Sequence, residues 1–171
     1  KIFHDLLLEY NKSYNLISKS TENNVWFRHI LDSAQILKFL DRRKASNIAD
    51  FGSGAGFPGL IIAIQLNNTQ FHVKLYEKSA VKREFLNKIK EKLGLENIEI
   101  NGDIYKSKIN SSIITCRAFK KLGEIVKISR EIITKPHKMI ILKGKDAQSE
   151  INNVSLGYNY SYKLEKSITD H

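Results

Sequence analysis

From residue 46 onward, the pattern of hydrophobic and polar positions switches repeatedly between the period of a strand and that of a helix. Short apolar runs predict strands at residues 46–51, 71–77, 97–101, 112–116 and 138–142. Helical periodicity between them predicts helices over residues 60–66, 81–93 and 122–133. This alternation predicts an α/β domain with a mostly parallel, doubly wound sheet.

Two further helices are predicted before this alternating section. Apolar positions from Phe3 to Tyr10 indicate a short helix, a loop is expected over residues 11–20, and a second helix from 21 to about 40. With 171 residues, the chain is long enough for one domain with a hydrophobic core. We therefore expect a single domain with N-terminal helices in residues 1–45 and an α/β core in residues 46–171.

The segment between the first predicted strand and the following helix reads D-F-G-S-G-A-G-F-P-G over residues 50–59. Its four glycines allow a backbone to approach a ligand closely, and Pro58 stands where the first helical residue is expected. A tight turn without a ligand is the alternative. The strand–loop–helix context favours a nucleotide-cofactor site.

An acidic residue, Glu77, follows the second predicted strand. It lies roughly 20 residues beyond the glycine-rich loop, the distance at which dinucleotide-binding folds place a ribose-binding carboxylate. A surface glutamate before a basic helix is the alternative. Its pairing with the loop favours hydrogen bonds from Glu77 to both hydroxyls of a ribose.

The spacing of the glycines distinguishes between cofactors. A dinucleotide loop reads G-x-G-x-x-G, whereas this one reads G-x-G-x-G-x-x-G with Asp50 two residues ahead. This resembles motif I of S-adenosylmethionine-dependent methyltransferases. That cofactor carries a positively charged ammonium and sulfonium, which an acid such as Asp50 can attract, whereas a pyrophosphate is negatively charged. Binding of NAD or FAD remains the alternative.

Composition adds a possible partner and excludes several site classes. Lys and Arg outnumber Asp and Glu by 28 to 18, and the resulting charge of +10 suggests a polyanion such as nucleic acid, or a lysine-rich compositional bias. The single cysteine excludes an intrachain disulfide framework and a cysteine-built zinc site, and no metal site is expected. Because no apolar run reaches ~18 residues, no membrane partner is expected. We expect a monomer located in the cytoplasm. We also expect that the chain has been trimmed before Lys1.

Six short segments carry a family pattern in order across nearly the whole chain. They read Y-N-L-I at 14–17, R-H-I-L-D-S at 28–33, the glycine-rich loop at 50–59, K-R-x-F-L at 82–86, C-R-A-F at 116–119 and L-K-G at 142–144. As a set they resemble the small-subunit (16S) ribosomal RNA guanine-N7 methyltransferases, also called glucose-inhibited division protein B. The resemblance implies a Rossmann-like S-adenosylmethionine-dependent methyltransferase fold, methyl transfer to guanine N7 of 16S ribosomal RNA, and the small ribosomal subunit or its RNA as partner.

The chain departs from that family in two places. Where the family carries Arg-x-Glu, this chain has Asp103 and Tyr105, so an adenine contact there is expected from the backbone. The family also ends with a further strand that completes the sheet. The last run of this chain, residues 158–166, leads us to expect that this strand is cut off or unpaired.

The loop and the resemblance together imply a set of site residues. The expected cofactor-binding residues are Asp50, Gly52, Gly54, Gly56, Phe57, Glu77, Ile104, Tyr105 and Arg117. Arg117 and Lys143 are also the candidate catalytic residues, which position the substrate; a structural ion pair and a plain surface lysine are the respective alternatives. His29 and Asp32 share one helix face, where they either cap the cleft or only stabilise the fold.

The reaction that the resemblance implies fits what the sequence lacks. Guanine N7 has an exposed lone pair and loses no proton on attack, so proximity and alignment suffice without an acid–base dyad. Enzymes that methylate exocyclic amines usually carry a Pro-Pro motif. Methylation of such amines is disfavoured here because Pro58 and Pro136 are the only prolines and are not adjacent. Cys116, in an apolar strand, is expected to be buried and inert rather than nucleophilic.

The RNA target and the competing functions follow from the same reasoning. Because N7 faces the deep major groove of an RNA duplex, an unpaired or splayed-out guanine is expected. The basic face of residues 82–92 and residues 117–145 are candidate phosphate surfaces, with a solvated helix face as the alternative for the former. A non-catalytic RNA-binding module and a small-molecule methyltransferase are the alternative functions. The intact glycines and Glu77 argue against the first, and the family resemblance and the charge against the second.

Overall fold

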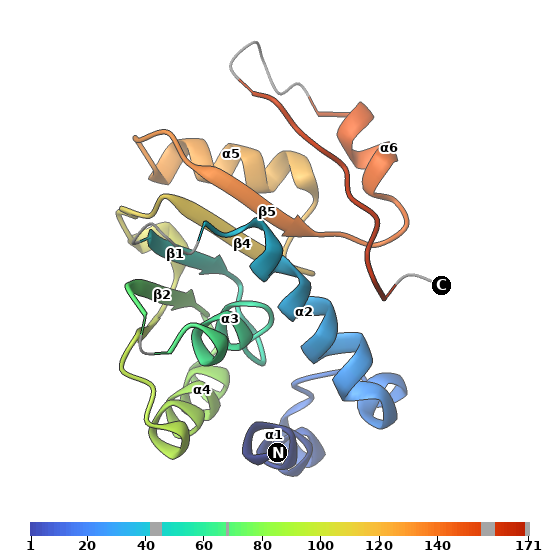
Figure 1. Ribbon diagram of the computed structural model, residues 1–171, viewed down its shortest axis with the longest axis vertical. Helices are drawn as coiled ribbons and strands as arrows, with labels where there is room; N and C mark the ends of the chain where they lie inside the picture. The colour runs from blue at the N-terminus through green and yellow to red at the C-terminus, as the bar shows by residue number, and fades with distance from the viewer. Residues whose placement is uncertain (42–45, 68, 155–159, 170–171) are drawn as a thin grey trace.

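One all-parallel sheet forms the centre of the protein. The computed structural model describes residues 1–41, 46–67, 69–154 and 160–169, and within these five strands pair in the order β3-β2-β1-β4-β5 (Figure 1). The strands are β1 (Ser46–Phe51), β2 (Phe71–Tyr76), β3 (Ile98–Asn101), β4 (Ile113–Arg117) and β5 (Lys138–Leu142). The chain runs outward from β1 to β3 and returns to β4, so the order reverses beside β1. Ligands of open α/β sheets bind at such a reversal point.

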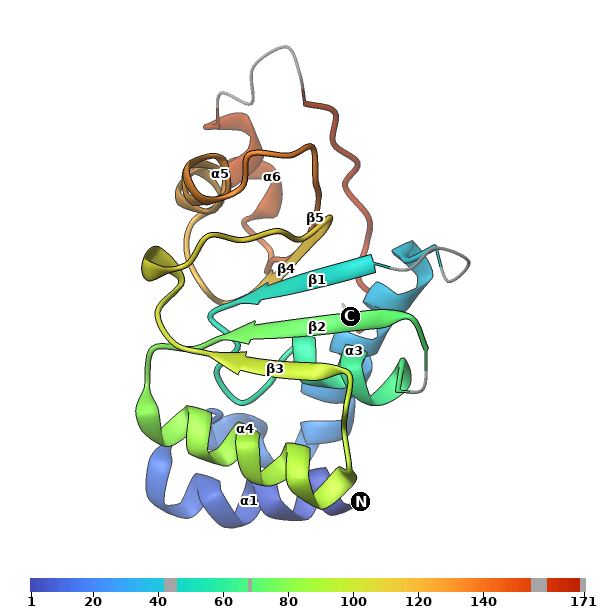
Figure 2. The same cartoon turned by 90° about the vertical axis from the view of Figure 1, so that its left-hand side faces the viewer.

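Helices cover both faces of the sheet, because successive side chains of each strand point in opposite directions (Figure 2). Ile48 of β1 belongs to a core shared with α1 (Ile2–Tyr14), α3 (Gly59–Gln65) and α4 (Ala80–Leu93). Its neighbour Ala49 belongs to the other core, together with Ile125 and Ile128 of α5 (Leu122–Ile132). The short α6 (Ala147–Asn152) packs against α5. The alternation read from the sequence therefore gives the predicted doubly wound sheet.

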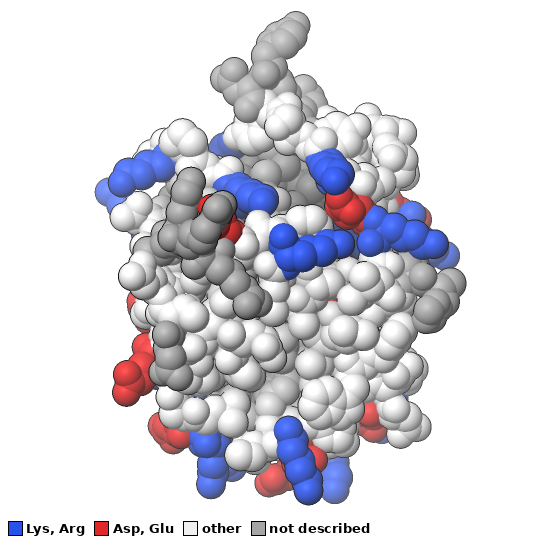
Figure 3. All heavy atoms as spheres, viewed as in Figure 1, with Lys and Arg blue, Asp and Glu red and all other residues white. Residues whose placement is uncertain are grey.

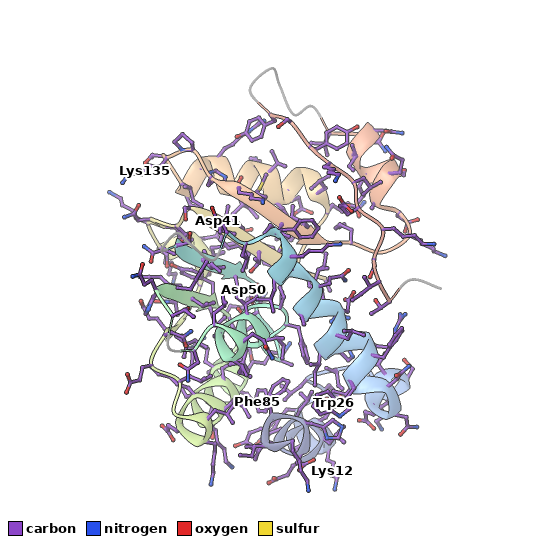
Figure 4. All side chains as sticks on the ribbon, in the orientation of Figure 1. Lys12, Trp26, Asp41, Asp50, Phe85 and Lys135 are labelled. Carbon is purple, nitrogen blue, oxygen red and sulfur yellow. The ribbon has the colours of Figure 1, made fainter. Side chains whose placement is uncertain are left out.

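The helices of the α/β core begin and end close to where the sequence predicts. In α4, the Ser79 hydroxyl accepts the amide of Lys82, and Gly94 ends the helix in the left-handed region with φ 58°. Phe85 lies in the core between α4 and α1 (Figure 4). Val81, four residues before Phe85, is 38% exposed, so the buried stripe of α4 begins at Phe85. Pro58 caps α3 instead of occupying its first turn.

The N-terminal segment differs from the prediction of one regular helix over residues 21–40. A 3₁₀ helix at Lys19–Asn24 precedes a π-helix at Trp26–Leu31, one α-helical turn at α2 (Asp32–Ala34), and a second 3₁₀ helix at Gln35–Phe39. Hydrophobic periodicity predicts helical structure but does not show where i→i+5 hydrogen bonds replace i→i+4 hydrogen bonds. Such π-helical turns are common at functional sites.

The loop before this segment is also shorter than the predicted residues 11–20, because α1 continues to Tyr14. Asn11, near its end, is buried and explains the turn that follows. Its side chain donates to Glu22 and accepts the amide of Ile17, so it ties the end of α1 to the chain beyond.

The described C-terminal residues, 160–169, contain no strand. Residues 158 and 159 of the run discussed above lie outside the described residues. In Figure 1 the red segment passes β5 and descends toward the blue helical segment that contains α2. None of the helices in the described ranges is long and apolar enough to cross a lipid bilayer.

Candidate functional site

A cavity of about 490 Å³ opens at the carboxyl ends of β1, β2 and β4. Its volume lies within the roughly 300–1,000 Å³ of small-molecule sites. Seven of the sequence-predicted residues line it: Gly52, Gly54, Phe57, Glu77, Ile104, Tyr105 and Arg117. Asp50, Gly56 and Lys143 do not line it. The sheet thus brings together residues that lie up to 65 positions apart.

The glycine-rich loop forms the floor of this cavity in conformations that a side chain would disturb. At Gly52, φ is +68° and an added Cβ would lie 2.3 Å from the ring of Phe119. Gly54 also has a positive φ of +57°, but a Cβ there would meet only Gly52 O, at 3.8 Å. The amide of Ser53 donates to Tyr76 O over 3.0 Å, which joins the loop to the end of β2. The loop therefore presents bare backbone to a ligand at Gly54.

Glu77 lies beside this loop with both carboxylate oxygens engaged by backbone amides. Oε2 accepts the amide of Gly54 at 2.9 Å, and Oε1 accepts the amide of Ser79 at 2.8 Å. Only 8% of the residue is exposed. A carboxylate can accept about four hydrogen bonds, so about two positions remain. The side chain is thus fixed in place with acceptor capacity for two hydroxyls, as the prediction of a ribose contact requires.

Asp50 lies in the interior beneath the loop (Figure 4). It is fully buried, and its Oδ1 accepts the hydroxyl of Thr115 at 2.9 Å. Desolvation raises the pKa of Asp50 to about 6, although hydrogen bonds from Ser53 and Thr115 oppose the shift. A Cβ added at Gly59 would lie 2.6 Å from the Cβ of Asp50, so the first turn of α3 packs directly onto Asp50. The structure places Asp50 as a support of the loop, separated from the cavity where the sequence led us to expect it.

The segment after β3 forms another wall. Ile104 is buried and faces the cavity, whereas Tyr105 is 54% exposed at its mouth. The Asp103 carboxylate accepts the amide of Tyr105 at 3.0 Å and caps a short 3₁₀ turn. This residue replaces the arginine of the family pattern, and its carboxylate stabilises the turn.

The opposite end of the cavity centres on Arg117, the last residue of β4. Its Nε atom lies 3.3 Å from Oδ2 of Asp32, and its Nη2 donates to Arg28 O over 2.7 Å. Its guanidinium carbon lies 5.9 Å from the centre of the Phe57 ring. The next residue, Ala118, has φ 49°, which is unusual for a non-glycine residue and turns the chain sharply at the cavity. Arg117 therefore both lines the cavity and forms the ion pair considered as its alternative.

His29 completes this end of the cavity. Its ring stacks on Phe57 with centroids 5.1 Å apart, and Nε2 lies 2.8 Å from the hydroxyl of Thr21. Burial, together with the charges of Arg117 and Arg28, lowers the pKa of His29 to about 4, although the charge of Asp32 opposes the shift. His29 is therefore neutral near pH 7, and it both lines the cavity and stabilises the fold through Thr21.

Lys143 lies outside the cavity wall. Its Nζ is 2.7 Å from Oε1 of Glu150 on α6 and donates to Lys120 O over 3.1 Å. The second oxygen of Glu150 accepts the amide of Leu122 at the start of α5. These contacts tie β5, α5 and α6 together. A substrate role for Lys143 stays a prediction.

Sequence reasoning missed several residues of the cavity wall. They are Leu16, Ile17, Ser53, Ala55, Tyr76, Lys78 and Gly102, whereas Lys82 and residues 118–120 fall within the candidate phosphate surfaces. Leu16 and Ile17 belong to the Y-N-L-I segment, whose place in the family pattern was a usable signal. Phe119 belongs to the C-R-A-F segment of the same pattern, but only the structure shows that its ring fills the space that the missing side chain of Gly52 leaves.

The sequence model of the family described as rRNA small subunit methyltransferase G matches residues 1–170. A Rickettsia felis protein named ribosomal RNA small subunit methyltransferase G is 39% identical over 170 residues, which cover 99% of this chain and 85% of that protein. Its Rickettsia prowazekii counterpart is 38% identical, with 99% and 86% covered. The chain belongs to this family. It is a methyltransferase, with S-adenosylmethionine as its cofactor.

Solved structures agree on the fold. An S-adenosylmethionine-dependent methyltransferase from Aquifex aeolicus aligns with a TM-score of 0.55 at 21% identity, covering 77% of this chain and 70% of that one. A structure from Methanococcus maripaludis, described as a putative S-adenosyl-L-methionine-dependent methyltransferase, aligns with a TM-score of 0.55 at 20% identity, covering 88% and 68%. The Rossmann-like methyltransferase fold that the sequence predicted is thereby confirmed.

Proposed function

We propose that this methyltransferase transfers a methyl group from S-adenosylmethionine to N7 of a guanine in small-subunit (16S) ribosomal RNA. The observation that supports it most is the cavity itself. It joins a bare glycine backbone and the fixed Glu77 carboxylate at one end to Arg117 and neutral His29 at the other. The name of the family and of its Rickettsia members supports the choice of RNA.

The residues of the Glu77 end fit the cofactor. The free acceptor positions of Glu77 suit the two ribose hydroxyls, and Ile104 and Tyr105 offer apolar surface on which an adenine can pack. The bare backbone at Gly52 and Gly54 leaves room for the amino-acid portion. When bound, the cofactor supplies an electrophilic methyl on a positively charged sulfur. The role of the protein is then to hold the donor in line with the acceptor atom.

We assign Arg117 and His29 to the end of the cavity where the cofactor meets the methyl acceptor, so that Arg117 contacts both. Guanine N7 attacks with a lone pair and needs no general base, which suits a neutral His29 and an arginine that stays charged. Guanine presents the acceptors N7 and O6 on one edge, and Arg117 carries only donors. A thiolate mechanism is disfavoured, because Cys116 is 1% exposed and burial raises the pKa of its thiol.

Charge near the cavity mouth supports a polyanionic substrate. Lys78, Lys82 and Lys120 line the mouth, within a chain of net charge +10. On the face shown in Figure 3, basic side chains lie across the upper part and along the lower edge, with some acidic side chains beside them and a largely uncharged area between the two. An RNA that contacts the mouth would have to present an unpaired guanine. We propose a monomer that acts in the cytoplasm, where ribosomal subunits are its substrate.

The direct test is transfer of label. The protein is incubated with small ribosomal subunits and S-adenosylmethionine labelled on its methyl group, and the RNA is digested and mapped for N7-methylguanine. We expect label at a single guanine. Cofactor binding with no label in RNA would contradict the proposal and favour a non-catalytic RNA-binding module. Label in small molecules alone would favour a small-molecule methyltransferase.

A paired substitution tests the cofactor end separately. Glu77→Gln removes the charge that holds the Gly54 amide and accepts the ribose, so we expect cofactor affinity to fall by about tenfold or more. Glu84→Gln, at an exposed position of α4, makes the same chemical change away from the cavity and should leave affinity unchanged. Calorimetric titration with S-adenosylhomocysteine measures both. Equal affinities of the two variants would show that Glu77 does not contact the cofactor.

A further inference from the structure

A single carboxylate, Asp32, joins the Arg117 end of the cavity to the C-terminal segment of the chain. Its Oδ2 atom lies 3.3 Å from Nε of Arg117. Its Oδ1 atom accepts hydrogen bonds from Gln35 Nε2 at 2.8 Å, Ser167 Oγ at 3.2 Å and Thr169 Oγ1 at 3.0 Å. One oxygen therefore contacts the cavity residue, and the other contacts a segment more than 130 residues away in sequence.

The guanidinium of Arg117 depends on this contact. Its polar partners among the described residues, Asp32 Oδ2 and Arg28 O, come from successive turns of the same helical segment. Nη1 of Arg117 is buried with no hydrogen-bond partner among the described residues. Burial lowers the pKa of Arg117, and the charge of Arg28 adds to this, whereas Asp32 opposes it. Without Asp32, a desolvated cation would face a second cation, and outward rotation into water would be favoured.

The C-terminal residues fix the orientation of the Asp32 carboxylate. The hydroxyls of Ser167 and Thr169 lie 2.9 Å apart and both donate to Oδ1, and the amide of Ile168 donates to Gln35 Oε1 over 3.1 Å. Thr169 is only 6% exposed. An oxygen with three donors cannot exchange places with Oδ2 without losing hydrogen bonds. The carboxylate plane is therefore set by Gln35 together with Ser167 and Thr169, with Oδ2 toward Arg117.

We propose that Asp32 is a positioning residue for Arg117, and that Ser167 and Thr169 complete this arrangement from the C-terminal segment. The segment would then contribute to cofactor affinity without contacting the cofactor. This inference rests on the proposed placement of the cofactor in the cavity that Arg117 lines. It does not depend on the identity of the methyl acceptor.

A double-mutant cycle on cofactor binding tests the proposal. Asp32→Asn, Arg117→Ala and the double variant are titrated with S-adenosylhomocysteine. We expect Asp32→Asn to weaken binding about tenfold in the native background, because small displacements of a positioned group are costly. In the Arg117→Ala background the same substitution should weaken binding by less than about twofold, since its effect requires the guanidinium. The melting temperature, by contrast, should fall in both backgrounds.

The C-terminal contribution is measured in the same cycle. Replacing both hydroxyls, by Ser167→Ala with Thr169→Val, should weaken binding about threefold, and this effect should also disappear in the Arg117→Ala background. Glu99→Gln is the matched control, because it removes a carboxylate that pairs with Lys74 at 2.9 Å, outside the cavity wall. Its binding should equal that of the native chain.

The outcomes separate this inference from the proposed function. Equal losses of affinity in the two Arg117 backgrounds would show that Asp32 acts through the fold as a whole, and would overturn the inference. Native protein that binds S-adenosylhomocysteine but transfers no label to RNA would contradict only the proposed substrate. Native protein that does not bind the cofactor would overturn both.

Discussion

At its Glu77 end the cavity is built from residues 52–57 and 76–79, whose contacts are mostly backbone hydrogen bonds next to the turn that they form. At its Arg117 end it joins residues 28–32 with Arg117 and, through Asp32, with residues 167–169. The first end depends on what the chain can do locally at the carboxyl ends of two adjacent strands. The second depends on ion pairs and hydroxyls that meet only when the whole chain has folded.

This difference teaches where substitutions should act. A change in the glycine-rich loop alters a rigid backbone that supports both the core and the cofactor, so stability and binding should change together. A change at the Arg117 end replaces one contact among several side chains, so binding can change with less effect on stability. The predictions below test this contrast, from the largest expected effect to the smallest.

The strongest way to break the Glu77 end is Gly59→Ala. An added Cβ would lie 2.4 Å from Leu75 Cδ2 and 2.6 Å from Asp50 Cβ in the interior between α3 and the sheet. We expect the free energy of unfolding to fall by about 3 kcal/mol, with cofactor affinity lost as well. Gly144→Ala is the control, because it is exposed with no atom within 4 Å of an added Cβ, and it should change stability by less than about 0.5 kcal/mol. Urea unfolding measures both, and similar midpoints would show that the packing under the loop is loose.

The pH dependence of stability should have opposite signs at the two ends. Asp50 has its pKa raised to about 6, so between about pH 4 and pH 6 the folded state binds more protons than the unfolded state. Its contribution therefore makes the free energy of unfolding fall as pH rises through this range, by about 3 kcal/mol at most. His29 has its pKa lowered to about 4, so the folded state binds fewer protons between about pH 4 and pH 6.5. Its contribution makes stability rise with pH there.

The measurement is urea unfolding at several values between pH 4 and pH 6.5. Asp50→Asn should make the slope of unfolding free energy against pH more positive than in the native chain. His29→Gln should make it more negative. Slopes that shift in the same direction for both variants would contradict the assignment of the two pKa shifts.

The smallest effect is expected from a pair of left-handed glycines. Gly54 and Gly94 have φ of +57° and +58°, and an added Cβ meets nothing closer than 3.8 Å at either position. Alanine at each should therefore cost about 1 kcal/mol of stability through backbone strain alone. Only Gly54 lines the cavity, so only Gly54→Ala should weaken the binding of S-adenosylhomocysteine, by about threefold. Equal binding of the two variants would show that the cofactor does not approach the loop at Gly54.

The core of the fold was predictable because its signals are local. The five strands and the helices α3, α4 and α5 follow from hydrophobic periodicity, Ser79 and Gly94 at the ends of α4, and the glycine-rich turn. The N-terminal segment was predicted as one regular helix and is not, because apolar positions three and four residues apart indicate a helical face but do not show how the backbone amides are bonded. Val81, the first residue of the predicted helix over 81–93, is exposed, because spacing does not tell how far a sheet extends beneath a helix.

The site was predictable to a similar degree. Gly52, Gly54, Glu77 and the 104–105 pair line the cavity as the loop and the family pattern predicted. Asp50 does not, because its position two residues before the glycines also places it beneath the loop and against α3. Lys143 does not either, because a partner that only the fold supplies, Glu150, binds its amine.

The sequence by itself determined the doubly wound sheet, the glycine-rich loop and the carboxylate that follows the next strand, because short segments carry their own backbone preferences and hydrophobic periodicity. Only the tertiary structure decided which carboxylate faces a ligand and which supports the fold, and that Arg117 meets Asp32, Ser167 and Thr169. The reason is physical: burial and pairing of a polar side chain depend on every segment packed around it, and such contacts leave no spacing in the chain.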